Sequence, residues 1–312
     1  MKKLIIVFIL FLLTACTQPS FESIDPSVDF LASLNTGDGS IDFLSEEREI
    51  IGNWQLDKAY TGFSLVTDDL ILVYGFTMNE AVIFQLSTGK QVSTIEVAEG
   101  TTNSYVYNEE IYIANGKENT ISHYNLEGKL LEQTSAGNYP MSMVTEGENL
   151  YVVNFKDERL SVFTLDLQEV TEWDIPSSSQ GILVNGDEIW LGGHGAGSSP
   201  NRVISRYDRA TGKLVGEIET PVMPIMMTAD ANGFIYALSH GSSTLYKISE
   251  TGEVLTSIKA GANPFSVAIF GESAVLAGYE DHQVYFIESG KVTDKVPVGK
   301  GPFQLIVREA SK

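Results

Sequence analysis

Two of the chain's four histidines follow a common pattern that could support chemistry. His194 and His240 each precede a glycine, and each lies four residues after an aromatic residue, Trp190 or Tyr236, in a short apolar run. A later apolar run is followed by the carboxylate of Glu280 at about the same distance. Two imidazoles with a carboxylate nearby can bind a metal or transfer protons. His194, His240 and Glu280 are therefore the candidate catalytic set.

The same residues also fit a simpler interpretation. A polar loop residue followed by glycine is ordinary turn chemistry. Only two of the four histidines share the pattern, so no third imidazole completes a metal site. The sequence shows no phosphate-binding loop, Ser-His-Asp arrangement or cysteine nucleophile. We therefore expect no metal and no cofactor, and we favour a binding role over an enzymatic one.

The elements that position these residues recur along the chain. A glycine-containing turn ends in proline at residues 137–140, 261–264 and 299–302, and each turn leads into an apolar stretch. Aligning the residue before each apolar stretch gives an interval of about 40 residues. The aligned positions are Thr61, Thr102, Pro140, Ser179, Pro224, Pro264 and Pro302. Each repeat holds four short runs rich in β-branched and aromatic residues, which is typical of a β-propeller blade.

The sequence thus predicts an all-β fold, a seven-bladed β-propeller. Six repeats are complete, and residues 302–307 repeat only the first strand. The missing strands can come from residues 41–44, 49–56 and 28–34, so that both ends of the chain close one blade and leave no open sheet edge. Residues 28–34 also fit a short helix. A six-bladed ring is the alternative count, and a parallel β-helix fits less well because its coils are shorter than about 40 residues.

Several runs resemble the repeats of YVTN-type propellers. They include residues 111–115 and 150–154, and the Val-Pro-Val-Gly-Lys-Gly-Pro-Phe segment at residues 296–303. That family has Tyr-Val-Thr-Asn on the second strand and Val-Gly-x-x-Pro before the next blade. The resemblance covers residues 60–308 and departs from the pattern at residues 189–193, where Ile-Trp-Leu-Gly-Gly replaces the motif. It implies a propeller fold, but the family includes surface and binding proteins of many kinds, so it implies function only loosely.

The repeat also predicts on which face of the propeller each loop lies. Because antiparallel strands reverse at each turn, the loops joining second to third strands share one face with the loops joining blades. We call this the interblade-loop face; a glycine- and serine-rich loop at residues 192–202 is a candidate ligand loop on it. Residues just after the start of each repeat are expected to rim the central channel on this face. The candidate ligand-binding residues are Phe155, His194, His240, Tyr279, Gln180, Met141 and Phe265.

The N-terminus predicts export. Lys2 and Lys3 precede an apolar run at residues 4–13 that is too short to span a bilayer and is typical of a signal peptide. The following Leu-Thr-Ala-Cys segment resembles the lipobox of bacterial lipoproteins, in which the cysteine is acylated and begins the mature chain. The resemblance implies a palmitate-type anchor on Cys16, the only cysteine. The expected organisation is a signal peptide at residues 1–15, a lipidated tether at 16–26 and a single propeller domain at 27–312.

The net charge and the predicted anchor together limit the classes of possible partner. The formal net charge of −21 argues against nucleic acid. We expect a lipid-anchored protein of the bacterial cell envelope, outside the cytoplasm, that acts as a binding or scaffolding module for an envelope protein or glycan. The alternative is a propeller enzyme, a lactonase or a lyase, with a metal-assisted site on the interblade-loop face. A sensor or chaperone of envelope assembly is a third interpretation.

Overall fold

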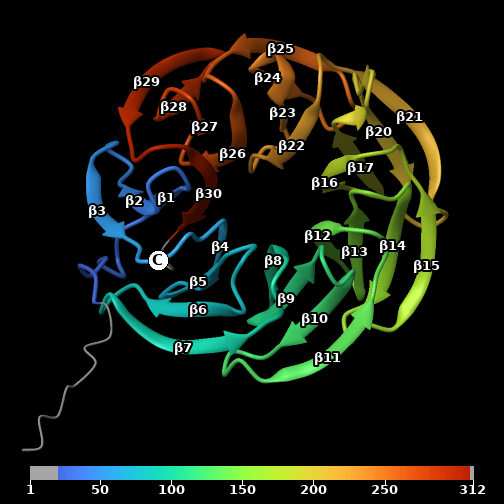
Figure 1. Cartoon of the computed structure of the whole chain (residues 1–312). Coiled ribbons are helices and arrows are strands. Elements are labelled where there is room, and N and C mark those ends of the chain that lie inside the picture. The colour runs from blue at the N-terminus through green and yellow to red at the C-terminus, as the bar shows by residue number, and fades with distance from the viewer. Residues whose placement is uncertain (1–19, 310–312) are drawn as a thin grey trace, which may run out of the picture.

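The chain folds into a ring of sheets around a central axis (Figure 1). The computed structural model describes residues 20–309, and within them seven antiparallel sheets have four strands each. The predicted seven-bladed β-propeller is therefore confirmed, and the six-bladed alternative is wrong. The predicted signal peptide and the lipid-attachment residue Cys16 lie outside the described residues.

We name the blades A to G. Blade A contains β4 (Gly62–Thr67), β5 (Leu70–Tyr74), β6 (Glu80–Gln85) and β7 (Lys90–Glu96). Blade B contains β8 (Thr101–Tyr107), β9 (Glu110–Asn115), β10 (Thr120–Tyr124) and β11 (Leu130–Ser135). Blade C contains β12 (Pro140–Glu146), β13 (Asn149–Asn154), β14 (Arg159–Thr164) and β15 (Glu169–Asp174). Blade D contains β16 (Ser179–Asn185), β17 (Glu188–Gly193), β20 (Val203–Asp208) and β21 (Lys213–Glu219).

The remaining blades complete the ring. Blade E contains β22 (Pro224–Ala229), β23 (Ile235–Ser239), β24 (Thr244–Ile248) and β25 (Val254–Lys259). Blade F contains β26 (Pro264–Phe270), β27 (Ser273–Gly278), β28 (Gln283–Glu288) and β29 (Lys291–Pro297). Blade G contains β30 (Pro302–Arg308), β1 (Phe30–Asn35), β2 (Ser40–Leu44) and β3 (Ile50–Gln55).

Blade G closes the ring with strands from both ends of the described chain. Its first strand, β30, is antiparallel to β1, with Leu31 opposite Val307. Strand β1 then pairs with β2, and β2 pairs with β3. The segment at residues 28–34 therefore contributes a strand, and the helix alternative for it is wrong. Pairing the two ends of the chain removes the open edge that an incomplete blade would leave.

The middle residues of the second strands are mostly apolar because these strands are buried on both sides. In blade B, Ile111 and Ile113 pack toward blade A, whereas Tyr112 and Ala114 pack toward blade C. Successive side chains of a strand point to opposite faces, so one strand supplies two blade-to-blade interfaces. The core is therefore a ring of separate interfaces between neighbouring blades.

Two of the aligned repeat positions differ from the structure by one residue. Pro140 begins β12, and its equivalents by strand register are Thr101 in blade B and Gly62 in blade A. The sequence alignment placed them at Thr102 and Thr61. Neither blade has the proline that marks the turn elsewhere, so the onset of apolarity was the only signal.

The segment before blade G packs on the propeller. Phe21 stacks on Trp54 with ring centroids 4.8 Å apart, and Ile24 is only 1% exposed. Ser20 also forms an isolated β-bridge with Lys90. The expected tether is therefore wrong for residues 20–26, because Phe21 and Ile24 provide the apolar surface that fills the boundary between blades G and A.

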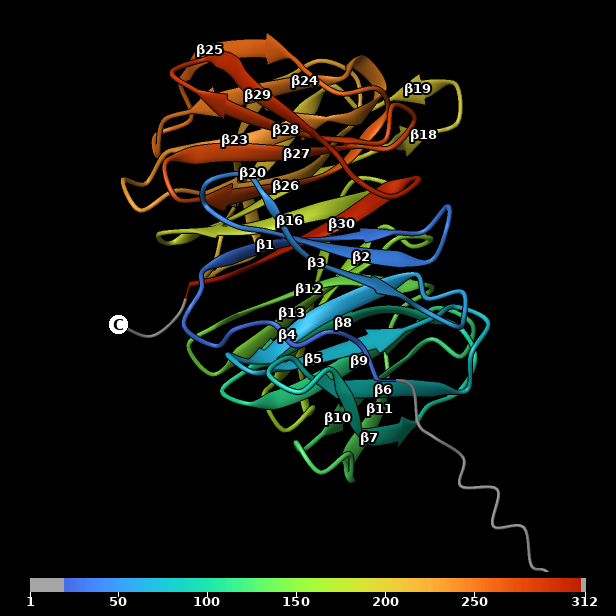
Figure 2. The ribbon, with the colours of Figure 1, turned by 90° about the vertical axis from the view of Figure 1, so that its left-hand side faces the viewer.

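The glycine- and serine-rich loop of blade D, at residues 192–202, contains a small hairpin. Strands β18 (Gly195–Ala196) and β19 (Ser199–Pro200) pair outside the blade. Figure 2 shows this hairpin and the end of β30 on opposite faces of the disc. The helical content of residues 20–309 is one 3-10 turn, η1 (His240–Ser242), and no helix in that range is long and apolar enough to cross a bilayer.

Candidate functional site

Eight half-buried rings form a continuous arc on the interblade-loop face. They are Phe76, Tyr139, Phe155, His194, His240, Phe265, Tyr279 and Phe303. Centroids of contacting rings lie 4.3–6.4 Å apart, which is the range for tilted and edge-to-face contacts. We call this set the aromatic arc. It presents to a partner a wide surface of aromatic rings whose positions are fixed by their contacts with one another.

The ends of the strands position these rings. Phe155, His194, His240 and Tyr279 each follow directly on a second strand, whereas Phe265 is the second residue of a first strand. Backbone hydrogen bonds hold both histidines: the His194 N–H donates to the Ser178 carbonyl and the His240 N–H to the Met223 carbonyl, each at 2.9 Å. The ring positions therefore follow from the sheet framework.

Blade B has a glycine at the loop position where blades C to F have a ring. A Cβ on Gly116 would lie 2.7 Å from Thr102 Cγ2 and 2.8 Å from Tyr139 Cδ2, closer than real contacts allow. Glycine at this position lets Tyr139 lie over blade B and connect Phe76 with Phe155. The Nζ of Lys156 lies 4.0 Å from the centroid of the Tyr139 ring, a cation–π contact at the edge of the arc.

The two histidines lie side by side in the middle of the arc. Their ring centroids are 6.0 Å apart. His240 Nδ1 is 3.0 Å from the Pro264 carbonyl oxygen, which can only accept, so Nδ1 carries the proton and the neutral ring keeps its lone pair on Nε2. Burial lowers the pKa of His194, and a proton on the neighbouring His240 would lower it further. The Nδ1 of His194 is buried without a hydrogen-bond partner among the described residues. His194 is therefore a neutral imidazole at neutral pH.

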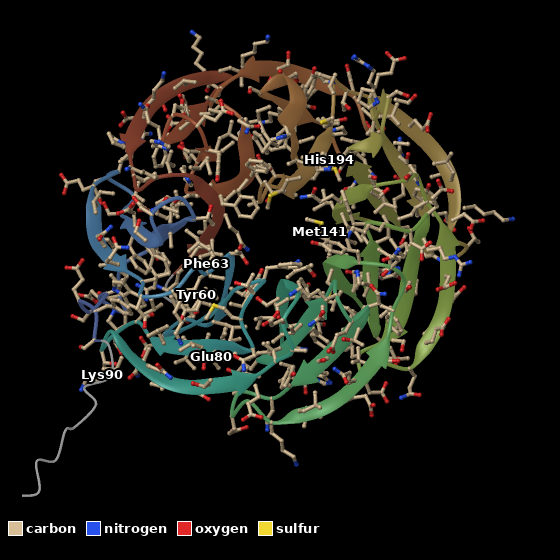
Figure 3. The ribbon with its side chains drawn as sticks, viewed as in Figure 1. Tyr60, Phe63, Glu80, Lys90, Met141 and His194 are labelled. Carbon is tan, nitrogen blue, oxygen red and sulfur yellow. The ribbon has the colours of Figure 1, made fainter. Side chains whose placement is uncertain are left out.

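The aromatic arc borders the mouth of the central channel. Figure 3 places His194 and Met141 beside the central opening. A cavity of about 240 Å³ in the channel is lined by Met141, Gln180, Phe265 and Phe303 together with further amide, hydroxyl and apolar side chains. No charged side chain lines it among the described residues. The cavity therefore suits a neutral group that can form hydrogen bonds with the amide side chains, either as donor or as acceptor.

The structure brings together all seven residues predicted to bind a ligand. Five of them, Phe155, His194, His240, Phe265 and Tyr279, belong to the aromatic arc. The other two are Met141 and Gln180, which line the channel together with Phe265. No ligand is present, so their binding role stays a prediction.

Three rings of the arc were not among the predicted ligand-binding residues: Phe303 was expected only at the channel rim, and Phe76 and Tyr139 were missed. Phe76 lies one residue beyond the aligned loop position, which glycine occupies in blade A. Tyr139 belongs to a glycine-to-proline turn and was considered only as a turn residue. Its positive φ of 61° was the unusual feature, and no sequence signal distinguishes such a tyrosine from an ordinary turn residue.

The third candidate catalytic residue lies on the loop after Tyr279. Glu280 is exposed, and its Oε1 accepts a hydrogen bond from Asn263 Nδ2 at 3.2 Å. Among residues 20–309, no group of three or more His, Cys, Asp or Glu side chains has the arrangement of a metal site. The histidine pair is thus the part of the candidate catalytic set that the structure brings together.

Comparison with known proteins identifies the fold. No family model matches the chain, and no curated protein matches it. A functionally unknown protein from Desulfotomaculum acetoxidans superposes with a TM-score of 0.77 at 13% identity, covering 91% of this chain and 100% of the other. Virginiamycin B lyase from Staphylococcus aureus superposes with a TM-score of 0.65 at 15% identity, covering 77% and 84%. BamB from Moraxella catarrhalis superposes with a TM-score of 0.61 at 11% identity, covering 94% and 97%. At these identities the likeness shows the β-propeller fold alone.

Proposed function

We propose that this chain is a lipid-anchored binding module of the bacterial envelope, located outside the cytoplasm, that holds an envelope protein or glycan on the aromatic arc. The aromatic arc is the observation that carries the proposal, because half-exposed rings at rigid positions are typical of residues that anchor a partner. Fixed rings also lose little side-chain entropy on binding.

The chemistry of the channel mouth favours a neutral glycan among these partners. Sugar rings present apolar faces and hydroxyl groups, and the site offers aromatic rings beside the amide of Gln180. The cavity lining has no charge to pair with an ionic group. A charged partner would have to lose water there without compensation. The membrane anchor at Cys16 belongs to the same proposal.

The test is a pull-down from bacterial envelope separated into a glycan fraction and a protein fraction. The double variant His240→Ala/Tyr279→Ala should lose at least about tenfold in affinity for one fraction, since each position removes an anchoring ring. Tyr107→Ala is the matched control, because Tyr107 is a half-buried tyrosine at the β8–β9 turn on the opposite face. Unchanged binding by a folded double variant would contradict the proposal.

The histidine pair supports a second candidate, a lyase or lactonase activity at the same place. A neutral imidazole with a free Nε2 can accept a proton from a substrate. Virginiamycin B lyase shares the fold, and a structure of its catalytically inactive histidine-to-alanine variant contains quinupristin. Turnover of a lactone or streptogramin that His240→Ala abolishes, with binding retained, would favour this candidate over the binding module.

A further inference from the structure

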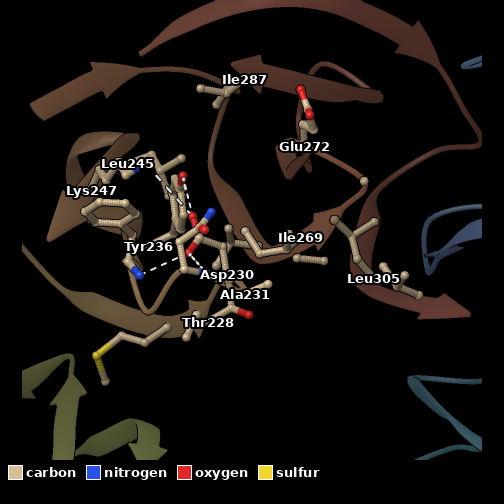
Figure 4. A pocket seen from close by; sticks show the side chains of 18 of the residues that line it. Thr228, Asp230, Ala231, Tyr236, Leu245, Lys247, Ile269, Glu272, Ile287 and Leu305 are labelled. Carbon is tan, nitrogen blue, oxygen red and sulfur yellow. Dashed lines mark hydrogen bonds and ion pairs between the residues drawn. The ribbon is translucent and has the colours of Figure 1, made fainter. Parts of the chain in front are cut away.

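A second, larger cavity opens on the face opposite the aromatic arc, between blades E and F. Figure 4 shows part of its lining, including Asp230, Lys247, Ile269 and Leu305. The cavity has a volume of about 1130 Å³ and extends from β25 at the outside to β30 beside the channel. Ligand pockets for small molecules reach about 1,000 Å³, so the groove is large enough for one. We call it the E/F groove.

A small residue of blade F lies beside the groove. Ala274 packs toward blade E, and in the register of blade F it pairs with Ile269 and Ile287, both of which line the groove. The same strand position holds a larger residue in the four preceding blades. These residues are Ile111, Leu150, Ile189 and Ile235, and all are buried. Blade F therefore has a smaller side chain at this position than blades B to E have.

The facing blade does not fill the space either. At the position of Tyr236, blades B, C and D have Tyr112, Tyr151 and Trp190, which are at most 1% exposed. Tyr236 stays half-exposed and lines the groove. Its hydroxyl donates to Asp230 Oδ2 at 3.3 Å. The side chain at this position is thus less buried in blade E than in blades B, C and D.

The walls and the rim of the groove differ in character. The walls are apolar, with Leu245, Ile258 and Ile269 among them. At the rim, Lys247 Nζ lies 3.9 Å from the Phe234 ring centroid and 4.0 Å from Asp230 Oδ2, so that cation already has partners. The side chains of Glu272 and Glu309 also line the groove, and neither forms a hydrogen bond or ion pair with another described residue.

We propose that the E/F groove binds a small amphipathic molecule with an apolar body and a cationic head. The apolar body would occupy the space beside Ala274, and the head would lie near the carboxylates of Glu272 and Glu309. The net charge of −21 favours a cation over an anion at this rim. This site is separate from the aromatic arc and does not depend on its function.

The test is calorimetric titration of the folded protein with decyltrimethylammonium below its micelle concentration, with decanoate as an anion of the same chain length. The cation should bind at least about tenfold more tightly than decanoate. Ile269→Phe should reduce its affinity by about tenfold or more, because it enlarges a side chain that lines the groove, and Ala274→Ile should act in the same direction through the neighbouring Ile269 and Ile287. Ile269 is half-buried, so its variant keeps the test valid if Ala274→Ile fails to fold.

A double variant tests the role of the two carboxylates. Two control variants then test whether surface charge in general, or the aromatic arc, affects binding of the cation. Glu272→Gln/Glu309→Gln should weaken the cation about fivefold to tenfold. Glu148→Gln, in the corresponding turn of blade C, should change nothing, and neither should His240→Ala on the opposite face. Equal affinity for the cation and decanoate, no binding of either, or binding unaffected by Ile269→Phe would overturn the proposal.

Discussion

Removing the Arg308 side chain should open the closure of the propeller. Arg308 is the penultimate described residue and is 1% exposed. Its guanidinium donates to the Asp25 and Val28 carbonyls before blade G and, at 3.0 Å, to the Asp68 carbonyl of blade A. It also lies 4.4 Å from the centroid of the Phe30 ring. One side chain therefore connects the two ends of the described chain to the neighbouring blade.

The expected cost in Arg308→Leu is about 3 kcal/mol of unfolding free energy. A hydrogen bond from a charged donor contributes about 1.5–3 kcal/mol, so three of them sum to about 5–9 kcal/mol. Burial lowers the pKa of Arg308, which shows that the charge is held at a desolvation cost. Leucine has no charge to desolvate, so Arg308→Leu avoids several kcal/mol of that cost. The net loss of unfolding free energy is therefore smaller than the sum of the three hydrogen bonds. For a domain of this size the midpoint of thermal unfolding should fall by roughly 5 °C.

The assay is urea and thermal unfolding followed by circular dichroism. Arg159→Leu is the matched control, because Arg159 forms one exposed ion pair with Glu172 and should cost about 1 kcal/mol or less. Arg308→Lys should fall between the wild type and Arg308→Leu, since an ammonium group cannot form the forked set of hydrogen bonds. If Arg308→Leu is as stable as Arg159→Leu, the closure does not depend on this side chain and the reasoning is refuted.

Two further predictions concern the aromatic arc. In His240→Ala the pKa of His194 should rise toward its ordinary value of 6.5, because less burial and no neighbouring charge remain to lower it, and a histidine NMR titration without a shift would contradict this. In the wild type the folded state binds this proton more weakly than the unfolded chain, so the contribution of His194 to stability should decrease as the pH falls below about 6.5. Gly116→Ala should displace the Tyr139 ring and weaken partner binding about tenfold at a stability cost of about 1 kcal/mol. Gly216→Ala, where the nearest atom would be 3.9 Å from the new Cβ, should leave both unchanged, and equal binding by the two variants would count against the role of Tyr139.

The repeat made much of the candidate site predictable. The interval between turns located the second strands, and the residue four positions after Trp190 or Tyr236 had to lie on the interblade-loop face. That reasoning found His194, His240, Phe155 and Tyr279 before any contact was known. It failed for residues 20–26, because a short polar segment with two apolar side chains does not show in sequence that Phe21 will reach Trp54.

The sequence by itself determined the fold class, the length of the repeat and the face on which each loop lies, whereas the structure decided between seven and six blades. These follow from local signals, since strand periodicity and turn residues act over a few neighbours in the chain. Only the tertiary structure decided which side chains meet. Tyr139 completes the arc over Gly116, a groove opens between blades E and F, and Arg308 reaches carbonyls some 240 and 280 residues away in sequence. Such contacts depend on how each blade is rotated about the common axis, and that rotation results from the packing of whole blades rather than from any one repeat.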